Sequence, residues 1–208
     1  MTEKSALGLL AVAGFMVAIG EVPSVFASTA ESFLTIESAN VSIDDNDDND
    51  DLTARLFVEG LLIPTDGTEG TFGYGILTDD GDSVLISHTH PGVLDSEDQR
   101  FNEDPIWHNH LVKLGDMEQC GDNQGVVDIT WQSPGEVRID DNVARISGVP
   151  TDEFEGWDSM TGESLSMTLG QDVSDVVSFK LNPVFGEDGL EAVCVTDIRS
   201  VEEEASVD

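Results

Sequence analysis

The chain has 208 residues, of which 39% are hydrophobic, and this is enough for one domain with a packed core. Its 43 Asp and Glu residues outnumber 8 Lys and Arg, so the formal charge is −35. Such an acidic surface repels phosphate backbones and anionic lipid headgroups, which argues against nucleic-acid binding and peripheral membrane binding. The charges are spread along the whole chain, as in a halophile-like protein whose carboxylates are screened by salt. A surface that collects calcium or other cations is the alternative.

The first segment, residues 1–30, has the features of a secretory signal peptide. Lys4 stands near the start, an apolar run covers residues 6–19, and small residues around Ala27 and Ala30 offer cleavage positions. The apolar run is shorter than the roughly 20 residues that span a bilayer. An uncleaved N-terminal anchor is the alternative, and in either case we expect the protein to be secreted or held at the cell surface.

Residues 31–53 are predicted to form an acidic linker. They contain the run DDNDDNDD at positions 44–51, which has nothing to bury and is therefore expected to be solvated. The helix-loop-helix calcium motif requires Gly at its sixth position and Glu at its twelfth. Counting from Asp44, these places hold Asn49 and Arg55, so the motif is not met.

Residues 54–201 are predicted to form a single all-β domain, followed by an acidic tail at 202–208. Short apolar and β-branched runs alternate with turn residues, and no stretch keeps a helical period with caps. The runs at 72–77 and 83–90 flank Asp79-Asp80-Gly81-Asp82, and those at 136–139 and 143–146 flank residues 140–142, both typical of hairpins. About nine short antiparallel strands predict a β-sandwich or a barrel.

The four histidines form two His-x-His pairs, His88 with His90 and His108 with His110. Side chains two residues apart on a strand project from the same face, so each pair is a potential two-ligand clamp. His88 and His90 share their phase with Val84 and Ile86, and the second pair shares its phase with apolar residues that follow it. Two such strands side by side would bring the imidazoles together, where they could bind a transition metal such as copper or zinc.

The segment 91–105 between the two pairs is the predicted functional loop. Its carboxylates could supply a further ligand or orient an imidazole; they are Asp95, Glu97, Asp98, Glu103 and Asp104. Three histidines with one carboxylate or water would leave a coordination position open for catalysis, whereas a closed four-ligand site would be structural or would store metal. The sequence does not decide between these, and it assigns no catalytic residue. Histidines that only make hydrogen bonds at a strand end are the alternative to a metal.

Two cysteines, Cys120 and Cys194, are predicted to form a disulfide. An even pair in an exported chain is most often bonded, and the long loop that it closes would stabilise the fold. A thiolate metal ligand is the alternative, but no His or Met follows Cys194 closely, as a cupredoxin-type copper site requires.

Two resemblances accompany these features. His88 and His90, with His108 or His110 as a later ligand, resemble the metal ligands of the cupin barrels, although Glu97 is displaced from the spacing of that family. The segments PTDGTEGTFGYGILTDDGDSVL, HPGVLDSEDQ, DPIWHNHLVKLG and GLEAVCVTDI are similar to a group of uncharacterised exported proteins of archaea such as ammonia oxidisers. That resemblance implies export and archaeal origin, and it implies no activity.

Three functions follow from the sequence. The first is an extracellular metal-binding β-domain that uses the two His-x-His pairs for metal handling or for surface redox or hydrolytic chemistry. The second is an acidic cell-envelope structural or interaction module without metal. The third is a cupin-like metalloenzyme.

Overall fold

The computed structural model describes residues 32–46, 49–62, 71–187 and 189–201. The predicted signal peptide at 1–30 and the predicted tail at 202–208 lie outside these residues. Within them no helix is long and apolar enough to cross a membrane.

The described residues form β-strands joined by turns and loops, with two short 3-10 turns, η1 (Ser32–Leu34) and η2 (Glu118–Cys120). The prediction of an all-β fold is confirmed. In chain order the strands are β1 (Ile36–Asn46), β2 (Asn49–Val58), β3 (Thr71–Thr78), β4 (Val84–Thr89), β5 (Trp107–Asp116), β6 (Gln124–Ile129), β7 (Glu136–Asp140), β8 (Val143–Pro150), β9 (Glu153–Trp157), β10 (Ser164–Thr168), β11 (Val173–Gly186) and β12 (Gly189–Ser200).

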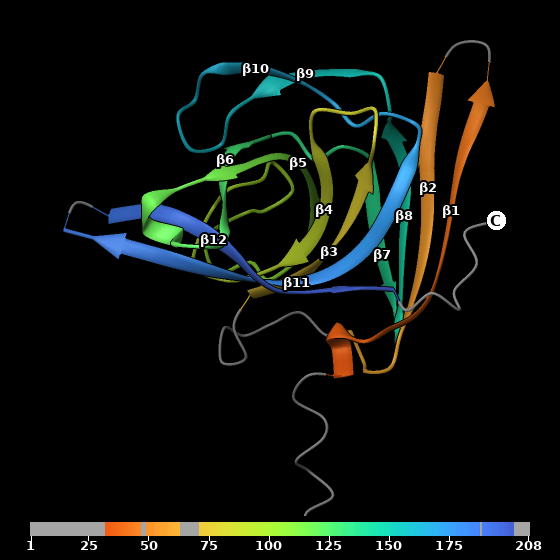
Figure 1. The fold of residues 1–208 in the computed structure, drawn as a ribbon, viewed down its shortest axis with the longest axis horizontal. Helices are drawn as coiled ribbons and strands as arrows, with labels where there is room; N and C mark the ends of the chain where they lie inside the picture. The colour runs from red at the N-terminus through yellow and green to blue at the C-terminus, as the bar shows by residue number, and fades with distance from the viewer. Residues whose placement is uncertain (1–31, 47–48, 63–70, 188, 202–208) are drawn as a thin grey trace, which may run out of the picture.

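Six strands close into a barrel in the order β11-β12-β6-β5-β4-β3, with antiparallel neighbours throughout (Figure 1). The strand pairs β3–β4 and β7–β8 are the two hairpins predicted from their turns. In the second hairpin Asp141 takes a left-handed backbone conformation with φ 55°, which Asp tolerates better than most residues. The hairpin β9–β10 lies beside the barrel.

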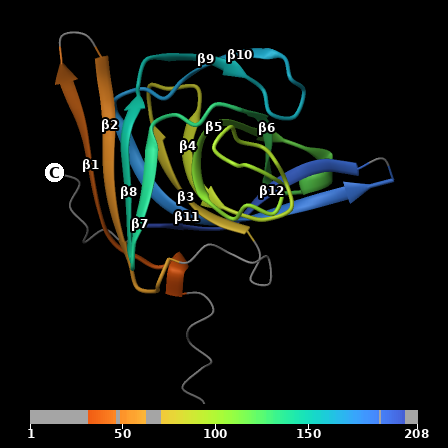
Figure 2. The ribbon, with the colours of Figure 1, turned by 180° about the vertical axis from the view of Figure 1, so that it is seen from behind.

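A four-stranded sheet, in the order β1-β2-β8-β7, packs against the outside of the barrel (Figures 1 and 2). Leu52 and Ile146 from this sheet share one buried cluster with Tyr74, Leu85 and Leu111 from β3, β4 and β5. A second buried cluster fills the barrel and includes alternate residues of the same barrel strands. Strands β4 and β5 are therefore buried on both faces, which fixes their register because a shift by one residue would exchange the two sets of side chains.

Residues 44–46 and 49–51 of the acidic run belong to paired strands, which corrects the expectation of a linker over 31–53. These residues are in β1 and β2, with Asp44 opposite Asp51. The pairing continues on both sides into buried residues, Val41 in β1 and Leu52 in β2. Because side chains alternate across a strand, the apolar residues reach the core while Asp44 stays exposed to water. Pairing of β2 with β8 outweighs the low strand propensity of Asp.

The predicted disulfide between Cys120 and Cys194 is present, with the two Cα atoms 5.4 Å apart. It joins η2 to β12 beside the place where the barrel closes. The ladder between β12 and β6 contains one paired position, Cys194 opposite Gly125. The disulfide therefore reinforces the part of the barrel that has the fewest ladder contacts. Disulfides of this kind are typical of proteins in oxidising compartments.

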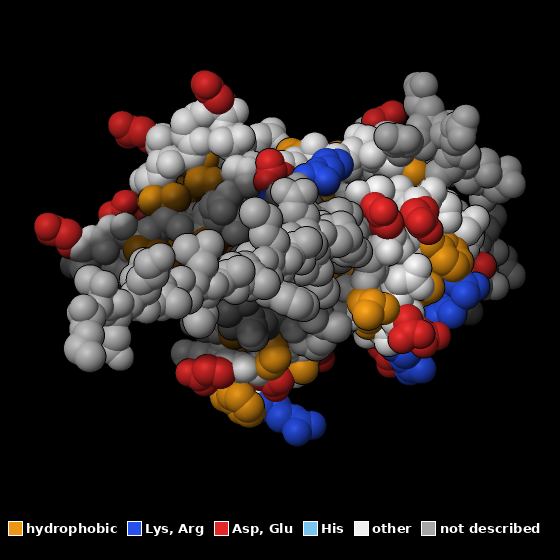
Figure 3. Space-filling view, turned by 90° about the horizontal axis from the view of Figure 1, so that it is seen from below, with side chains coloured by type: hydrophobic (Ala, Val, Ile, Leu, Met, Phe, Trp, Pro, Cys, Tyr) orange, Lys and Arg blue, Asp and Glu red, His pale blue; other side chains and the backbone are white. Residues whose placement is uncertain are grey.

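The surface carries the acidic excess. Figure 3 shows Asp and Glu side chains distributed around one face, with a few Lys or Arg side chains among them. Some of the basic residues are paired: Lys113 Nζ lies 2.7 Å from Asp82 Oδ2, and Lys180 Nζ lies 3.1 Å from Asp197 Oδ2. Most carboxylates thus have no basic partner, as the net charge requires.

Candidate metal centre

The two histidine pairs lie on neighbouring barrel strands and face one another. In the β4–β5 ladder His88 is opposite His108, and Ile86 is opposite His110. His90 follows the last residue of β4. The ring centroids of contacting imidazoles are between 4.6 and 5.2 Å apart. The prediction that these strands bring the imidazoles together is confirmed, and all four rings are buried.

One carboxylate of the predicted functional loop, that of Asp95, reaches the cluster. Its Oδ2 lies 3.1 Å from His90 Nε2 and 3.8 Å from His110 Nε2, and its Oδ1 lies 3.4 Å from His108 Nε2. The loop crosses one end of the barrel (Figure 2). This places Asp95 above the ends of β4 and β5.

The other acidic residues of the loop do not join the cluster. Glu97, Asp98 and Glu103 are exposed. Asp104 is half-buried, and its carboxylate accepts a hydrogen bond from the backbone N–H of Arg100 at 3.2 Å. Of the five predicted carboxylates, Asp95 is therefore the one placed to contact a metal.

Four side chains offer ligand atoms that all lie within 4.8 Å of one another: His88, Asp95, His108 and His110. His90 stands outside this set and hydrogen-bonds to the Asp95 carboxylate. The candidate ligands thus differ from the four histidines predicted: three histidines and one carboxylate could hold an ion, and His90 orients the carboxylate.

Several buried polar atoms of the cluster have no hydrogen-bond partner among the described residues. They are both ring nitrogens of His88, Nε2 of His108, Nε2 of His110 and Oδ1 of Asp95. Buried polar groups are nearly always hydrogen-bonded, because leaving one unpaired costs about 1–3 kcal/mol. One ligand atom from each of the four residues lies within 4.8 Å of the others, so a single cation could satisfy one atom of each residue.

Backbone carbonyls fix the orientation of two imidazoles. His108 Nδ1 lies 3.0 Å from the carbonyl oxygen of Ile106, and His110 Nδ1 lies 2.6 Å from that of Thr130. A carbonyl oxygen only accepts, so each Nδ1 carries the proton and donates it. Each Nε2 is then left with a lone pair directed into the cluster, which is the usual state of a metal-binding histidine.

Burial and neighbouring groups set the charges of the cluster. Burial lowers the pKa of His88 well below its ordinary value, and the neighbouring imidazoles lower it further. Burial also lowers the pKa of His110 to about 4. Burial by itself would raise the pKa of Asp95, but His108 and His90 beside the carboxylate outweigh that effect and lower it. Neutral imidazoles and an ionised carboxylate are the forms that bind a metal cation.

Gln99 holds the loop that carries Asp95, and sequence reasoning missed it. Its side-chain oxygen accepts hydrogen bonds from the backbone N–H groups of Asp95, at 3.0 Å, and Ser96, at 3.2 Å. Its nitrogen donates to the backbone carbonyl of Val93 at 3.0 Å. Nothing in the sequence distinguishes this glutamine from a solvated one, because its role depends on the folded path of the loop.

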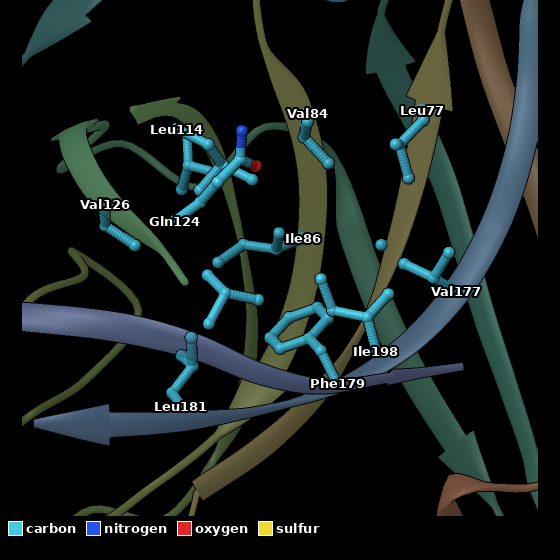
Figure 4. A pocket seen from close by; sticks show the side chains of 13 residues that line it. Leu77, Val84, Ile86, Leu114, Gln124, Val126, Val177, Phe179, Leu181 and Ile198 are labelled. Atoms are coloured by element: carbon cyan, nitrogen blue, oxygen red, sulfur yellow. The ribbon is translucent and has the colours of Figure 1, made fainter. Parts of the chain in front are cut away.

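A cavity of about 380 Å³ opens next to the cluster, and its lining includes His88, His90 and Asp95. The fully buried His108 and His110 lie behind them. A second cavity of about 90 Å³ occupies the apolar interior of the barrel (Figure 4). Val84 and Ile86 line this second cavity, which confirms that they share the inward face of β4 with His88.

The chain matches no protein-family model, no curated protein and no solved structure. The resemblance to exported archaeal proteins therefore stays a prediction.

Proposed function

We propose that the protein binds one divalent transition-metal ion, with His88, His108, His110 and Asp95 as its ligands. The observation that carries the proposal is the convergence of buried donor atoms that lack hydrogen-bond partners. A cluster with a purely structural role would instead pair these atoms with one another or with the backbone. Metal ligands stand at about 2.0–2.2 Å from an ion, so binding would draw the four atoms slightly closer together.

The donor set selects the class of metal. Three imidazole nitrogens with one carboxylate oxygen suit zinc or copper(II), and also iron(II). Calcium and magnesium prefer oxygen ligands, which this cluster does not supply in sufficient number. We therefore propose copper or zinc, and the acidic surface would raise the local concentration of either cation.

His90 is proposed as a positioning residue. Its Nε2, 3.1 Å from Asp95 Oδ2, holds the carboxylate over the other three imidazoles. Residues that orient a ligand in this way typically alter metal affinity by 10–100-fold when they are replaced.

A metal-dependent reaction is a second candidate function, and the cavity favours it. The cavity reaches the cluster on the side of His88 and Asp95, so an ion held by the four ligands could take a fifth ligand from that side. Closed sites serve structural roles, whereas an accessible position allows a bound water or substrate to react. The disulfide supports the proposal that this chemistry takes place outside the cytoplasm.

Metal loading of the full chain tests the proposal. Protein stripped with a chelator would be offered zinc or copper, dialysed, and analysed for bound metal by mass spectrometry. We expect one ion per chain and a higher Tm, because a ligand that binds the folded state stabilises it. The Asp95→Asn variant keeps the shape of the side chain and removes its charge, so we expect its metal affinity to fall at least about tenfold.

The matched control is Glu97→Gln, which makes the same chemical change on the same loop at an exposed position. We expect it to bind metal as the unmodified protein does. A protein that retains neither metal and shows no change in Tm would instead support the metal-free envelope module.

A further inference from the structure

The cavity next to the cluster has mostly hydrophobic walls. Apart from His88, His90 and Asp95, its polar side chains are those of Thr71 and Ser159. The remaining lining residues are hydrophobic, apart from Gly92. No Lys or Arg is among the lining residues. An anionic ligand would meet no basic side chain there, and it would face the Asp95 carboxylate.

The mouth of the cavity gathers exposed hydrophobic side chains. Ten large hydrophobic residues are exposed in the described part of the chain, and five of them line this cavity: Val93, Leu94, Met160, Phe185 and Leu190. Single exposed hydrophobic residues are common on protein surfaces, but their concentration around one opening is typical of a ligand site. They come from the β4–β5 loop, the β11–β12 hairpin and the loop after β9, so three separate segments form the rim.

The apolar surface continues beyond the cluster into the barrel. Ile86, Val126 and Leu181 border both the larger cavity and the inner one, and Figure 4 shows them beside the inner space. Apolar side chains therefore line both cavities. An apolar group that enters the larger cavity removes its surface from water, whereas a strongly hydrated group would lose its hydration there.

From these observations we infer that the cavity binds an uncharged, largely apolar small molecule, which contacts the metal through one nitrogen, oxygen or sulfur donor. This inference rests on the proposed function, because the metal supplies the polar contact. Affinity then comes from two sources: coordination at the position that faces the cavity, and burial of the apolar part against the walls. The acidic surface adds discrimination against anions.

Three probes that share one donor group separate these contributions. The full chain would be loaded with Co²⁺, whose visible absorption changes with coordination, and titrated with imidazole, 4-phenylimidazole and imidazole-4-carboxylate. We expect 4-phenylimidazole to bind at least about tenfold more tightly than imidazole, because its ring is buried in the cavity. The carboxylate probe should bind more weakly than 4-phenylimidazole.

Two variants make the test specific to the cavity. Phe185→Asp places a charge on the rim, so the preference for 4-phenylimidazole should fall toward the level of imidazole. Val127→Asp makes a comparable change at an exposed position of β6 outside the cavity, and the preference should be kept.

The outcomes distinguish the two proposals. A protein that retains no metal overturns the proposed function, and this inference with it. A metal-loaded protein that binds imidazole and 4-phenylimidazole equally, or whose preference is unchanged by Phe185→Asp, overturns the inference about the cavity and leaves the metal centre in place.

Discussion

His88 combines complete burial with two ring nitrogens that have no hydrogen-bond partner among the described residues. Such a residue is a cost to the metal-free fold, because its desolvation is not offset by new hydrogen bonds. A functional role explains why a sequence keeps it, since stability and function often oppose one another at a binding site. The effect of replacing this residue can therefore distinguish a metal ligand from a structural histidine.

The variant His88→Leu tests this at the residue scale. We expect it to weaken metal binding by at least about tenfold, and to leave the Tm of the metal-free protein unchanged or raise it by a few degrees, because an unpaired polar group is removed from the interior. Equilibrium metal titration and calorimetry measure the two effects. The control is Ser87→Ala, on the same strand, which also removes an unpartnered buried atom. The Ser87 side chain points away from the cluster, so this variant should bind metal normally. A large fall in the stability of metal-free His88→Leu would indicate a structural histidine.

At this scale the sequence predicted part of the site. The period of two along a strand was sufficient to place all four imidazoles on the inward face, because β4 and β5 are regular and adjacent. Selection of Asp95 from the five acidic residues of the loop was not predictable. It depends on hydrogen bonds between the Gln99 side chain and the loop backbone, and such contacts have no periodic pattern in a sequence.

At the scale of the elements, the junction where β6 pairs with β12 (the β6–β12 seam) is the part of the barrel that depends most on a covalent link. It has a single ladder position, and the Cys120–Cys194 disulfide lies beside it. The disulfide joins residues that are 74 positions apart in the sequence, so it restricts the unfolded chain over a long loop.

Removing the disulfide should lower stability without removing the metal centre. For the double variant Cys120→Ala/Cys194→Ala we expect a loss of about 2–5 kcal/mol in the free energy of unfolding. The metal content should stay the same, because the ligands come from β4, β5 and their connecting loop. Chemical denaturation and elemental analysis provide the two measurements. Loss of metal at a temperature where the variant is still folded would show that the seam supports the site.

The elements also show where sequence patterns fail. The hairpins β3–β4 and β7–β8 were predicted from apolar runs and from their turn residues. The strands β1 and β9 were not predicted, because they contain acidic residues, which have low strand propensity: Asp44 in β1, and Glu153 and Glu155 in β9. Strand pairing with a neighbour overrides local propensity at such positions.

For the molecule as a whole, the sequence could not decide between a sandwich and a barrel. The structure has a closed barrel with a separate sheet packed on it. The barrel requires the pairing of β11 with β3, which are about a hundred residues apart in the chain. Local patterns contain no information about partners at that distance, whereas the choice between the two architectures depends on them.

The net charge of −35 predicts that the stability of the whole molecule depends on salt. Repulsion between carboxylates destabilises the compact state, and the screening length falls from about 10 Å at 0.1 M salt to about 3 Å at 1 M. We therefore expect Tm to rise as NaCl is increased over this range. Differential scanning calorimetry measures it, and the same series in an uncharged osmolyte is the control. A Tm that does not change with NaCl would contradict the interpretation of the surface as adapted to salt.

The ligands come from two kinds of segment, and this difference predicts how an ion would exchange. His88, His108 and His110 belong to strands with both faces buried, whereas Asp95 belongs to a loop that Gln99 fastens by its side chain. Opening of that loop would detach one ligand and leave the other three in position, without unfolding the barrel. An ion could then exchange at the rate at which the loop opens, so the lifetime of the loaded state would be set by a few hydrogen bonds to one glutamine.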